Sequence, residues 1–341
     1  MSEAIKPALA LLRDGDAPSA AILDQAFAAI LSGDATQAQI GAFLMGLERL
    51  TLTSEMIASG AQAMRGAMTR VDTSHACVDV CGTGGDGSHT LNISTAVSFV
   101  LAGCGQKVAK HGNRAMSSKS GAADVLEALG VKLELTPDQC AAALDGVGLV
   151  FLFAQAHHPA MRHVGPARRE LGFRTIFNLL GPLSNPAGAQ RQLVGVFADD
   201  KRRPIAQALM SLGCESAWVV HGHGGLDELS LSGPTRVTAL KDRTLSELEI
   251  HPGDLGLATA PLEALKGGDA AHNALALRAL LQGETGPYRD VVLLNSAAAL
   301  MASAAALDLT EALARATASL DSQAALTKLD QLIAFTNRTP S

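Results

Sequence analysis

Short apolar segments alternate with segments of helical pattern from residue 76 onward, and this alternation constrains the fold more than any other feature of the chain. The apolar segments predict strands at residues 77–81, 107–110, 148–153, 193–197 and 217–220. Helical patterns lie between them, beginning near residue 93, at 120–129 and after 200. Such alternation is typical of a mainly parallel sheet covered by helices. The larger part of the chain is therefore predicted to be an α/β domain.

The first seventy residues have a different pattern, which predicts helices alone. Thr36 and Gln39 have the spacing of a capping box, and a further helix begins at Thr53. The first of these helices carries an apolar stripe formed by Ile40, Phe43, Leu44, Leu47 and Leu50. One face of the second is marked by Met56, Ile57, Gly60, Met64 and Met68. Because a small helical module has apolar surface to cover, part of this second face is expected to contact another copy of the chain in a homodimer.

The change of pattern near residue 71 predicts two domains in the 341-residue chain. A small all-helical domain is expected over residues 1–71, joined by a helical segment near 170–188. The α/β domain is expected over residues 72–341, with a helical tail from 270 to 335.

Composition and charge exclude several classes of protein. Hydrophobic residues make up 48% of the chain, which excludes a disordered linker. With 27 basic and 33 acidic residues the net charge is −6, which argues against a broad nucleic-acid interface. A local basic pocket for a small anion remains compatible with this charge.

The cysteines and one uncharged segment bear on location. The five cysteines are scattered and odd in number, which favours free thiols in a reducing compartment. No secretory signal is visible in residues 1–15. The uncharged segment 291–307 contains Asn295, Ser296 and Ser303 and is mostly alanine, so a buried helix is predicted rather than a membrane span. A cytoplasmic protein that binds neither membrane nor nucleic acid is expected.

A glycine-rich turn is the strongest local signal for chemistry. The segment GTGGDG at 82–87 leaves a predicted strand and is followed by NIST at 92–95, where a helix begins. Glycines allow backbone N–H groups to converge on an anion, and a helix N-terminus adds unpaired donors and partial positive charge. The spacing matches neither a P-loop nor a dinucleotide-binding fingerprint. The turn is therefore predicted to bind phosphate, with Asp86 engaging a metal or a sugar hydroxyl.

A cationic segment follows the second predicted strand. Residues 110–119 contain Lys110, Arg114 and Lys119 together with several hydroxyl groups. Ligands of open parallel sheets bind at such strand ends. Together with the glycine-rich turn, this segment predicts a pocket for a ligand with two phosphate groups.

Adjacent acids at Asp227 and Glu228 predict a metal site. Neighbouring carboxylates repel each other, and a divalent cation removes that penalty. His221 and His223 lie nearby and raise the alternative of zinc, but carboxylates beside a phosphate pocket favour magnesium.

A third cluster, at residues 157–174, is rich in histidine and arginine and precedes the apolar, proline-containing segment 175–186. An arginine beside a rigid apolar wall suits an aromatic carboxylate, because guanidinium pairs with it through two hydrogen bonds. Arg168 is the arginine predicted to do this.

Taken together, these segments make the chain resemble the anthranilate phosphoribosyltransferase family. The matching motifs, in order along most of the chain, are GTGGDG (82–87), NIST (92–95), KHGNRAMSSKSGAADVLEALG (110–130), HHPAMRHVGPARRELGFRTIFNLLGPLSNP (157–186) and GLDEL (225–229). The resemblance implies a fold of the nucleoside-phosphorylase and phosphoribosyltransferase type. It also implies a pentosyl transfer in which the amine of anthranilate displaces pyrophosphate from phosphoribosyl pyrophosphate. This reaction is the second step of tryptophan biosynthesis from chorismate.

The resemblance also implies roles for individual residues. Phosphoribosyl pyrophosphate would be bound by Gly82, Gly85, Asp86, Thr90, Asn92, Ile93, Ser94, Thr95, Lys110, His111, Gly112, Asn113, Arg114, Ala115, Met116, Ser117, Ser118 and Ala122. Anthranilate would be bound by Gly82, Asn113 and Arg168, with His111 and Pro182 lining its route. Magnesium, two ions per protomer, would be held by Ser94, Asp227 and Glu228. No catalytic side chain is expected, since an arylamine is already neutral and needs only positioning and charge neutralisation.

Two alternatives remain open at this point. A pyrimidine nucleoside phosphorylase would suit the cationic segment, but it has no use for a metal loop with two carboxylates. A non-catalytic nucleic-acid-binding relative should lose the phosphate and metal residues and gain basic surface, whereas GTGGD and Asp227-Glu228 are intact here.

Overall fold

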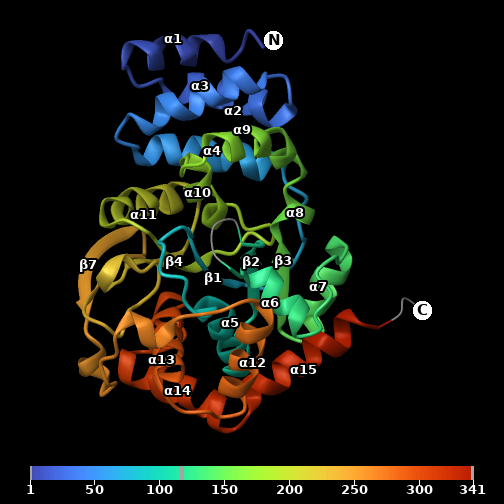
Figure 1. Cartoon of the computed structure of the whole chain (residues 1–341), viewed down its shortest axis with the longest axis vertical. Coiled ribbons are helices and arrows are strands. Elements are labelled where there is room, and N and C mark those ends of the chain that lie inside the picture. The colour runs from blue at the N-terminus through green and yellow to red at the C-terminus, as the bar shows by residue number, and fades with distance from the viewer. Residues whose placement is uncertain (1, 116–118, 339–341) are drawn as a thin grey trace.

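The computed structural model describes residues 2–115 and 119–338. Its first part consists of helices α1 (Lys6–Asp14), α2 (Ala20–Ser32), α3 (Gln37–Glu48) and α4 (Ser54–Ala67), which form one end of the molecule (Figure 1). The predicted capping box at the start of α3 is confirmed, because Thr36 Oγ1 accepts from Gln39 N at 3.2 Å and Gln39 Oε1 accepts from Thr36 N at 3.0 Å. Thr53 caps α4 in the same way, accepting from Met56 N at 3.3 Å.

The strands form a seven-stranded sheet in the order β3-β2-β1-β4-β5-β6-β7. Their bounds are β1 (Val78–Gly82), β2 (Val108–Gly112), β3 (Leu149–Phe153), β4 (Arg191–Gly195), β5 (Ser216–His221), β6 (Thr235–Lys241) and β7 (Thr244–Ile250). Strands β1 to β5 pair in parallel, whereas β6 and β7 are antiparallel. The predicted fold class and its five strands are confirmed. The hairpin of β6 and β7 was not predicted.

Helices cover both faces of this sheet (Figure 1). The remaining α-helices are α5 (Ile93–Gly103), α6 (Ala122–Ala128), α7 (Pro137–Gly146), α8 (Ala154–His157), α9 (Gly165–Leu171), α10 (Ile176–Leu180), α11 (Arg202–Ser211), α12 (Ala270–Leu281), α13 (Pro287–Ala302), α14 (Leu309–Asp321) and α15 (Ala324–Thr336). Short 3-10 helices are η1 (Pro159–His163), η2 (Gly181–Leu183), η3 (Asp199–Lys201), η4 (His223–Gly225), η5 (Pro252–Leu255) and η6 (Leu262–Leu265).

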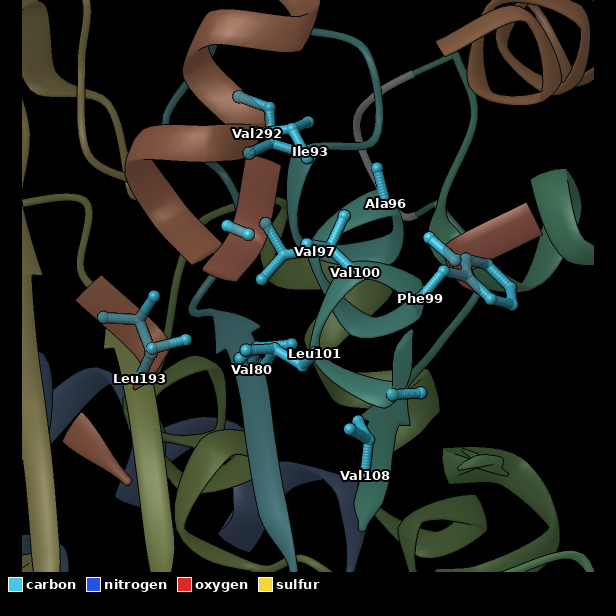
Figure 2. Close-up of a cluster of buried hydrophobic side chains, with 14 of the residues drawn as sticks. Val80, Ile93, Ala96, Val97, Phe99, Val100, Leu101, Val108, Leu193 and Val292 are labelled. Carbon is cyan, nitrogen blue, oxygen red and sulfur yellow. The ribbon is translucent and has the colours of Figure 1, made fainter. Parts of the chain in front are cut away.

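Helix α5 is the centre of the main core. It packs on β1 and β2 and is covered by α13, α14 and α15. Figure 2 shows Val97 and Leu101 of α5 between Val80 of the sheet and Val292 of α13. The prediction of a buried helix holds for residues 291–302 of the uncharged segment, whereas 303–307 follow the end of α13 and Leu307 is exposed. No helix among the described residues is long and apolar enough to cross a membrane. The five cysteines are free.

A second core joins the N-terminal helices to later segments. Helices α9 and α10 pack on α3 and α4, and α11 packs on α4 from the sheet side. The prediction that this face of α4 contacts another copy of the chain is therefore wrong, because Met56, Ile57 and Met64 are buried within this chain. A Cβ on Gly60 would meet Leu180 at 2.8 Å, which shows how closely α10 covers this face.

Candidate active site

The candidate site lies where the direction of the sheet connections reverses. Strand β1 has β2 on one side and β4 on the other, and β3 and β5 extend the sheet outward from them. Open α/β sheets bind ligands at such a switch point, beyond the carboxyl ends of the strands. Two loops meet there, namely the glycine-rich turn after β1 and residues 222–229 after β5. In the turn, Gly84, Gly85 and Gly87 have φ of 70°, 74° and 79°, a backbone region that favours glycine.

The loop at residues 222–229, called here the metal loop because it carries Asp227 and Glu228, closely approaches the ends of β1 and β4. A Cβ on Gly82 would lie 2.2 Å from Asp227 Oδ2, and one on Gly195 would lie 1.5 Å from the Asp227 carbonyl oxygen. Only glycine leaves room for Asp227 at these two positions. Gly84 N donates to Asp227 Oδ2 at 2.7 Å. The glycine-rich turn at residues 82–87, called here the phosphate turn after its predicted role, is therefore hydrogen-bonded to the metal loop.

Asp227 and Glu228 both have raised pKa values. Burial, with the charge of Asp86, raises the pKa of Asp227 above its usual range. Burial, with the charge of Asp227, raises the pKa of Glu228 in the same direction. Asp227 N also donates to Asp86 Oδ2 at 3.4 Å, which keeps a third carboxylate near the pair. The predicted repulsion is therefore present, and a divalent cation would relieve it.

The α5 N-terminus and Lys110 complete this part of the site. Ser94 N donates to Glu228 Oε1 at 3.2 Å. Lys110 Nζ donates to Ser94 Oγ at 3.1 Å and to Val80 O at 2.7 Å. Oxygen donors with this excess of negative charge fit magnesium. Within the described ranges no group of three or more His, Cys, Asp or Glu side chains is placed to hold a metal ion. His221 Nδ1 lies 2.8 Å from Val196 O, and His223 Nδ1 lies 3.1 Å from Ser232 Oγ.

The other residues predicted to bind phosphoribosyl pyrophosphate lie at the start of α5, in the segment before it, at the end of β2 and at the start of α6. Asn92, Ile93 and Thr95 lie at the start of α5, where Ile93 is buried in the core and offers only its backbone. Thr90 forms an isolated bridge with Lys266. His111 and Gly112 end β2, Asn113 and Ala115 follow it, and Ala122 begins α6. Met116, Ser117 and Ser118 lie outside the described residues.

Arg114 is paired with two acidic side chains of α6. Its guanidinium pairs with Asp124 at 3.0 Å and with Glu127 Oε1 at 2.8 Å, and it lies over the Phe153 ring. Its positive charge is therefore already matched within α6. Lys110, by contrast, reaches β1 and the start of α5 through Val80 O and Ser94 Oγ.

Arg168 is held by α10. Its Nη2 donates to Asn178 Oδ1 at 3.2 Å, and its guanidinium carbon lies 5.9 Å from the centre of the Phe177 ring. Thr175 N donates to the same Asn178 oxygen at 3.0 Å, which fixes that side chain. The sequence predicted Arg168 and the apolar wall but missed Asn178, for which the only signal was its place three residues after Thr175.

Neutral histidines adjoin the wall. His111 Nδ1 lies 3.2 Å from Gly181 O, and its Nε2 lies 3.2 Å from His158 Nε2. Burial lowers the pKa of both rings, that of His158 to about 4. Pro182 is buried beside them, and its carbonyl accepts from Gln192 Nε2 at 2.8 Å. This region therefore presents neutral rings and apolar surface.

Side chains that the sequence reasoning missed hold the phosphate and acceptor regions together. Asp79 is fully buried in β1, where its Oδ1 accepts from His111 N at 3.1 Å. Asn185 Nδ2 donates to Asp79 Oδ2 and to Ala109 O, both at 2.8 Å, and so links β1 to β2. Arg174 donates to Gly85 O and thereby connects the segment after α9 to the phosphate turn. For these three residues the sequence offered a single signal, which was the acid Asp79 between Val78 and Val80 in a predicted strand.

Comparison with known proteins agrees with this geometry. Residues 74–326 match the model of a glycosyl transferase family, a/b domain, and residues 6–68 match its helical bundle domain. The chain belongs to this glycosyl transferase family. An anthranilate phosphoribosyltransferase of Rhodopseudomonas palustris (strain BisA53) is 56% identical over 312 residues, which cover 92% of each chain. That similarity places the chain among the anthranilate phosphoribosyltransferases of the family.

Solved structures give the same result. The anthranilate phosphoribosyltransferase of Thermus thermophilus matches with a TM-score of 0.93 and 41% identity, covering 99% of this chain and 100% of the other. The enzyme of Saccharomyces cerevisiae, solved in complex with PRPP and Mg, matches with a TM-score of 0.90 and 28% identity over 98% of both chains.

Proposed function

We propose that this chain transfers the phosphoribosyl group of 5-phosphoribosyl 1-pyrophosphate to the amine of anthranilate. The products are N-(5-phosphoribosyl)anthranilate and pyrophosphate, as in the second step of tryptophan biosynthesis from chorismate. One observation carries the proposal: the phosphate turn, the α5 N-terminus and the Asp227–Glu228 pair are hydrogen-bonded into one site at the switch point.

The phosphate groups are bound by backbone and cation together. The turn supplies the backbone N–H groups that Asp227 does not use, and the start of α5 adds the partial positive charge of a helix N-terminus. Lys110 brings a positive charge from β2. We assign magnesium, two ions per protomer, to Asp227, Glu228 and Ser94; when bound, it neutralises charge on the leaving pyrophosphate. This assignment is supported by the burial and mutual repulsion of the two carboxylates.

The acceptor is bound by residues at the end of β2 and by residues 168–182. Arg168 pairs with the carboxylate of anthranilate, while Asn178 and Phe177 hold the guanidinium. Asn113 contacts the acceptor, and His111 and Pro182 line its route. Because burial keeps His111 and His158 neutral, they place no charge that would repel a cationic ribose.

Catalysis then follows from alignment of the two substrates. The amine nitrogen attacks C1 of the ribose as the bond to pyrophosphate breaks, and C1 acquires oxocarbenium character. The arylamine is neutral at pH 7, so it reacts without prior loss of a proton. After the C1–N bond forms, the nitrogen loses one proton to the departing pyrophosphate or to solvent, which gives the neutral secondary amine of the product. Holding both reactants in line can supply on the order of 7–11 kcal/mol of the barrier reduction.

The reaction and its metal dependence are tested together. Anthranilate fluorescence should fall when the purified protein is mixed with phosphoribosyl pyrophosphate and magnesium. The double variant Asp227→Ala, Glu228→Gln should lose orders of magnitude of turnover at low magnesium while its circular dichroism is unchanged. Wild-type turnover of that variant across a magnesium titration would contradict the metal assignment. Phosphorolysis of thymidine or uridine would instead support the phosphorylase alternative, and a gel shift with single-stranded DNA the nucleic-acid alternative.

Helix α3, unlike α4, has an apolar face that is exposed and available to contact another copy of the chain. The outer side of α3 carries exposed Ala38, Ala42 and Met45, and residues 37–47 contain no charge. A helix whose outer side is also apolar needs a partner, and a homodimer through α3 supplies one.

We retain the domain division at residues 71 and 72. The free thiols support a reducing, cytoplasmic location.

A further inference from the structure

Asn295 lies in the middle of α13 and contacts the metal loop directly. From Val291 to Ala302 this helix is otherwise apolar except for Ser296, and the Asn295 side chain is fully buried. Its Oδ1 accepts from Leu229 N at 2.8 Å, and its Nδ2 donates to Leu229 O at 2.9 Å. Nδ2 also donates to Val291 O at 2.8 Å. Both amide hydrogens and the amide oxygen are therefore used.

The contact acts as a substitute for a strand neighbour. Leu229 directly follows Glu228, and one side chain satisfies both of its backbone groups, as a paired strand would. On the other side of the loop, Gly195 and Gly82 fit closely against Asp227. The acid pair is thus held on both sides, with Asp227 against β1 and β4 and Glu228 next to the fixed Leu229.

We infer that Asn295 is a positioning residue for the metal site, holding the Asp227–Glu228 loop in its metal-ready form before any cation binds. Two buried carboxylates that repel each other favour a loop that moves toward solvent. The double hydrogen bond to Leu229 opposes this movement, so the loop does not have to be ordered when metal and substrate bind. The inference rests on the proposed role of Asp227 and Glu228 as magnesium ligands.

Ser296 provides a matched control. It follows Asn295 in the same helix and is equally buried, but its Oγ has no hydrogen-bond partner among the described residues. Ser296→Ala therefore removes a buried polar atom from α13 without removing a hydrogen bond to the metal loop. It should leave metal binding unchanged.

The experiment measures binding of Mn²⁺ by electron paramagnetic resonance, with pyrophosphate present at saturation. Asn295→Leu should weaken the apparent Mn²⁺ affinity by about 10–100-fold, the range seen when supports of metal ligands are removed. The KM for anthranilate should stay near the wild-type value. If Asn295→Leu lowers thermal stability but binds Mn²⁺ as tightly as wild type and Ser296→Ala, the role is merely structural and the inference is wrong.

Two further measurements keep the test decisive. Asp227→Ala separates the two proposals: loss of Mn²⁺ binding there but not in Asn295→Leu overturns only this inference, whereas retention in Asp227→Ala overturns the metal site itself. If Asn295→Leu fails to fold, hydrogen exchange of the wild-type protein decides. The Leu229 amide should then be as protected as the amides of β5, and rapid exchange of that amide would overturn the inference.

Discussion

Replacement of Gly195 by alanine tests the close approach at the centre of the site. The new Cβ would lie 1.5 Å from the Asp227 carbonyl oxygen and 2.3 Å from its carbonyl carbon. Strand β4 cannot withdraw, because Gly195 is paired with Gly82 of β1 and with Val220 of β5. Since a Cβ essentially never lies within 3.0 Å of a nonbonded heavy atom, the metal loop must move away by at least about 1.5 Å.

That displacement gives the expected size of the effect. A misplacement of about 1 Å can cost roughly 100-fold in rate, so kcat/KM should fall by at least about 100-fold. This corresponds to about 2.7 kcal/mol of transition-state stabilisation. Overpacking of this kind costs about 1–3 kcal/mol of folding stability, which the domain should survive.

Fluorescence kinetics over a magnesium titration provide the assay, with thermal unfolding measured in parallel. Gly146→Ala is the matched control, because a Cβ there meets nothing within 4 Å and the residue lies in α7, away from the site. If Gly195→Ala keeps kcat/KM within a few-fold of wild type, the metal loop does not need the position that the glycines give it, and this reasoning is refuted.

Other predictions concern the acceptor side, acid stability and assembly. Arg168→Ala should raise the KM for anthranilate far more than that for phosphoribosyl pyrophosphate, because truncating one member of a buried charge pair costs about 2–5 kcal/mol; equal KM values in variant and wild type would remove Arg168 from the site. Asn178→Asp should have the same selective effect, since its carboxylate would compete for Arg168, and steady-state kinetics would show it. His158 has its pKa lowered from 6.5 to about 4, so its contribution to stability is complete above about pH 6.5 and is lost as pH falls toward 4. The loss should reach about 3 kcal/mol in denaturant unfolding, and His158→Gln should reduce this pH dependence; an identical dependence in both proteins would count against it. Met45→Glu should shift sedimentation from dimer to monomer, and an unchanged dimer would exclude the α3 face.

Local sequence determined the features that depend on near neighbours. The caps at Thr36 and Thr53 and the phosphate turn follow from hydrogen bonds and backbone preferences within a few residues. The raised pKa values of Asp227 and Glu228 are only partly local: neighbouring carboxylates repel in any fold, but burial is the largest cause and Asp86 adds a charge from a distant turn. The hairpin of β6 and β7 was missed for a local reason too. Its two-residue turn uses Asp242 and Arg243, both with positive φ, where the usual signal is Asn-Gly or Asp-Gly.

Tertiary structure decided everything that depends on which distant segments meet. The apolar face of α4 suggested an exposed interface, but α10 and α11, more than a hundred residues later, bury it. Gly195 and Asn295 showed no sign in the sequence of their contacts with the metal loop. A glycine's need for space and an asparagine's choice of partner are set by the packing around them, and that packing exists only once the sheet and α13 have come together.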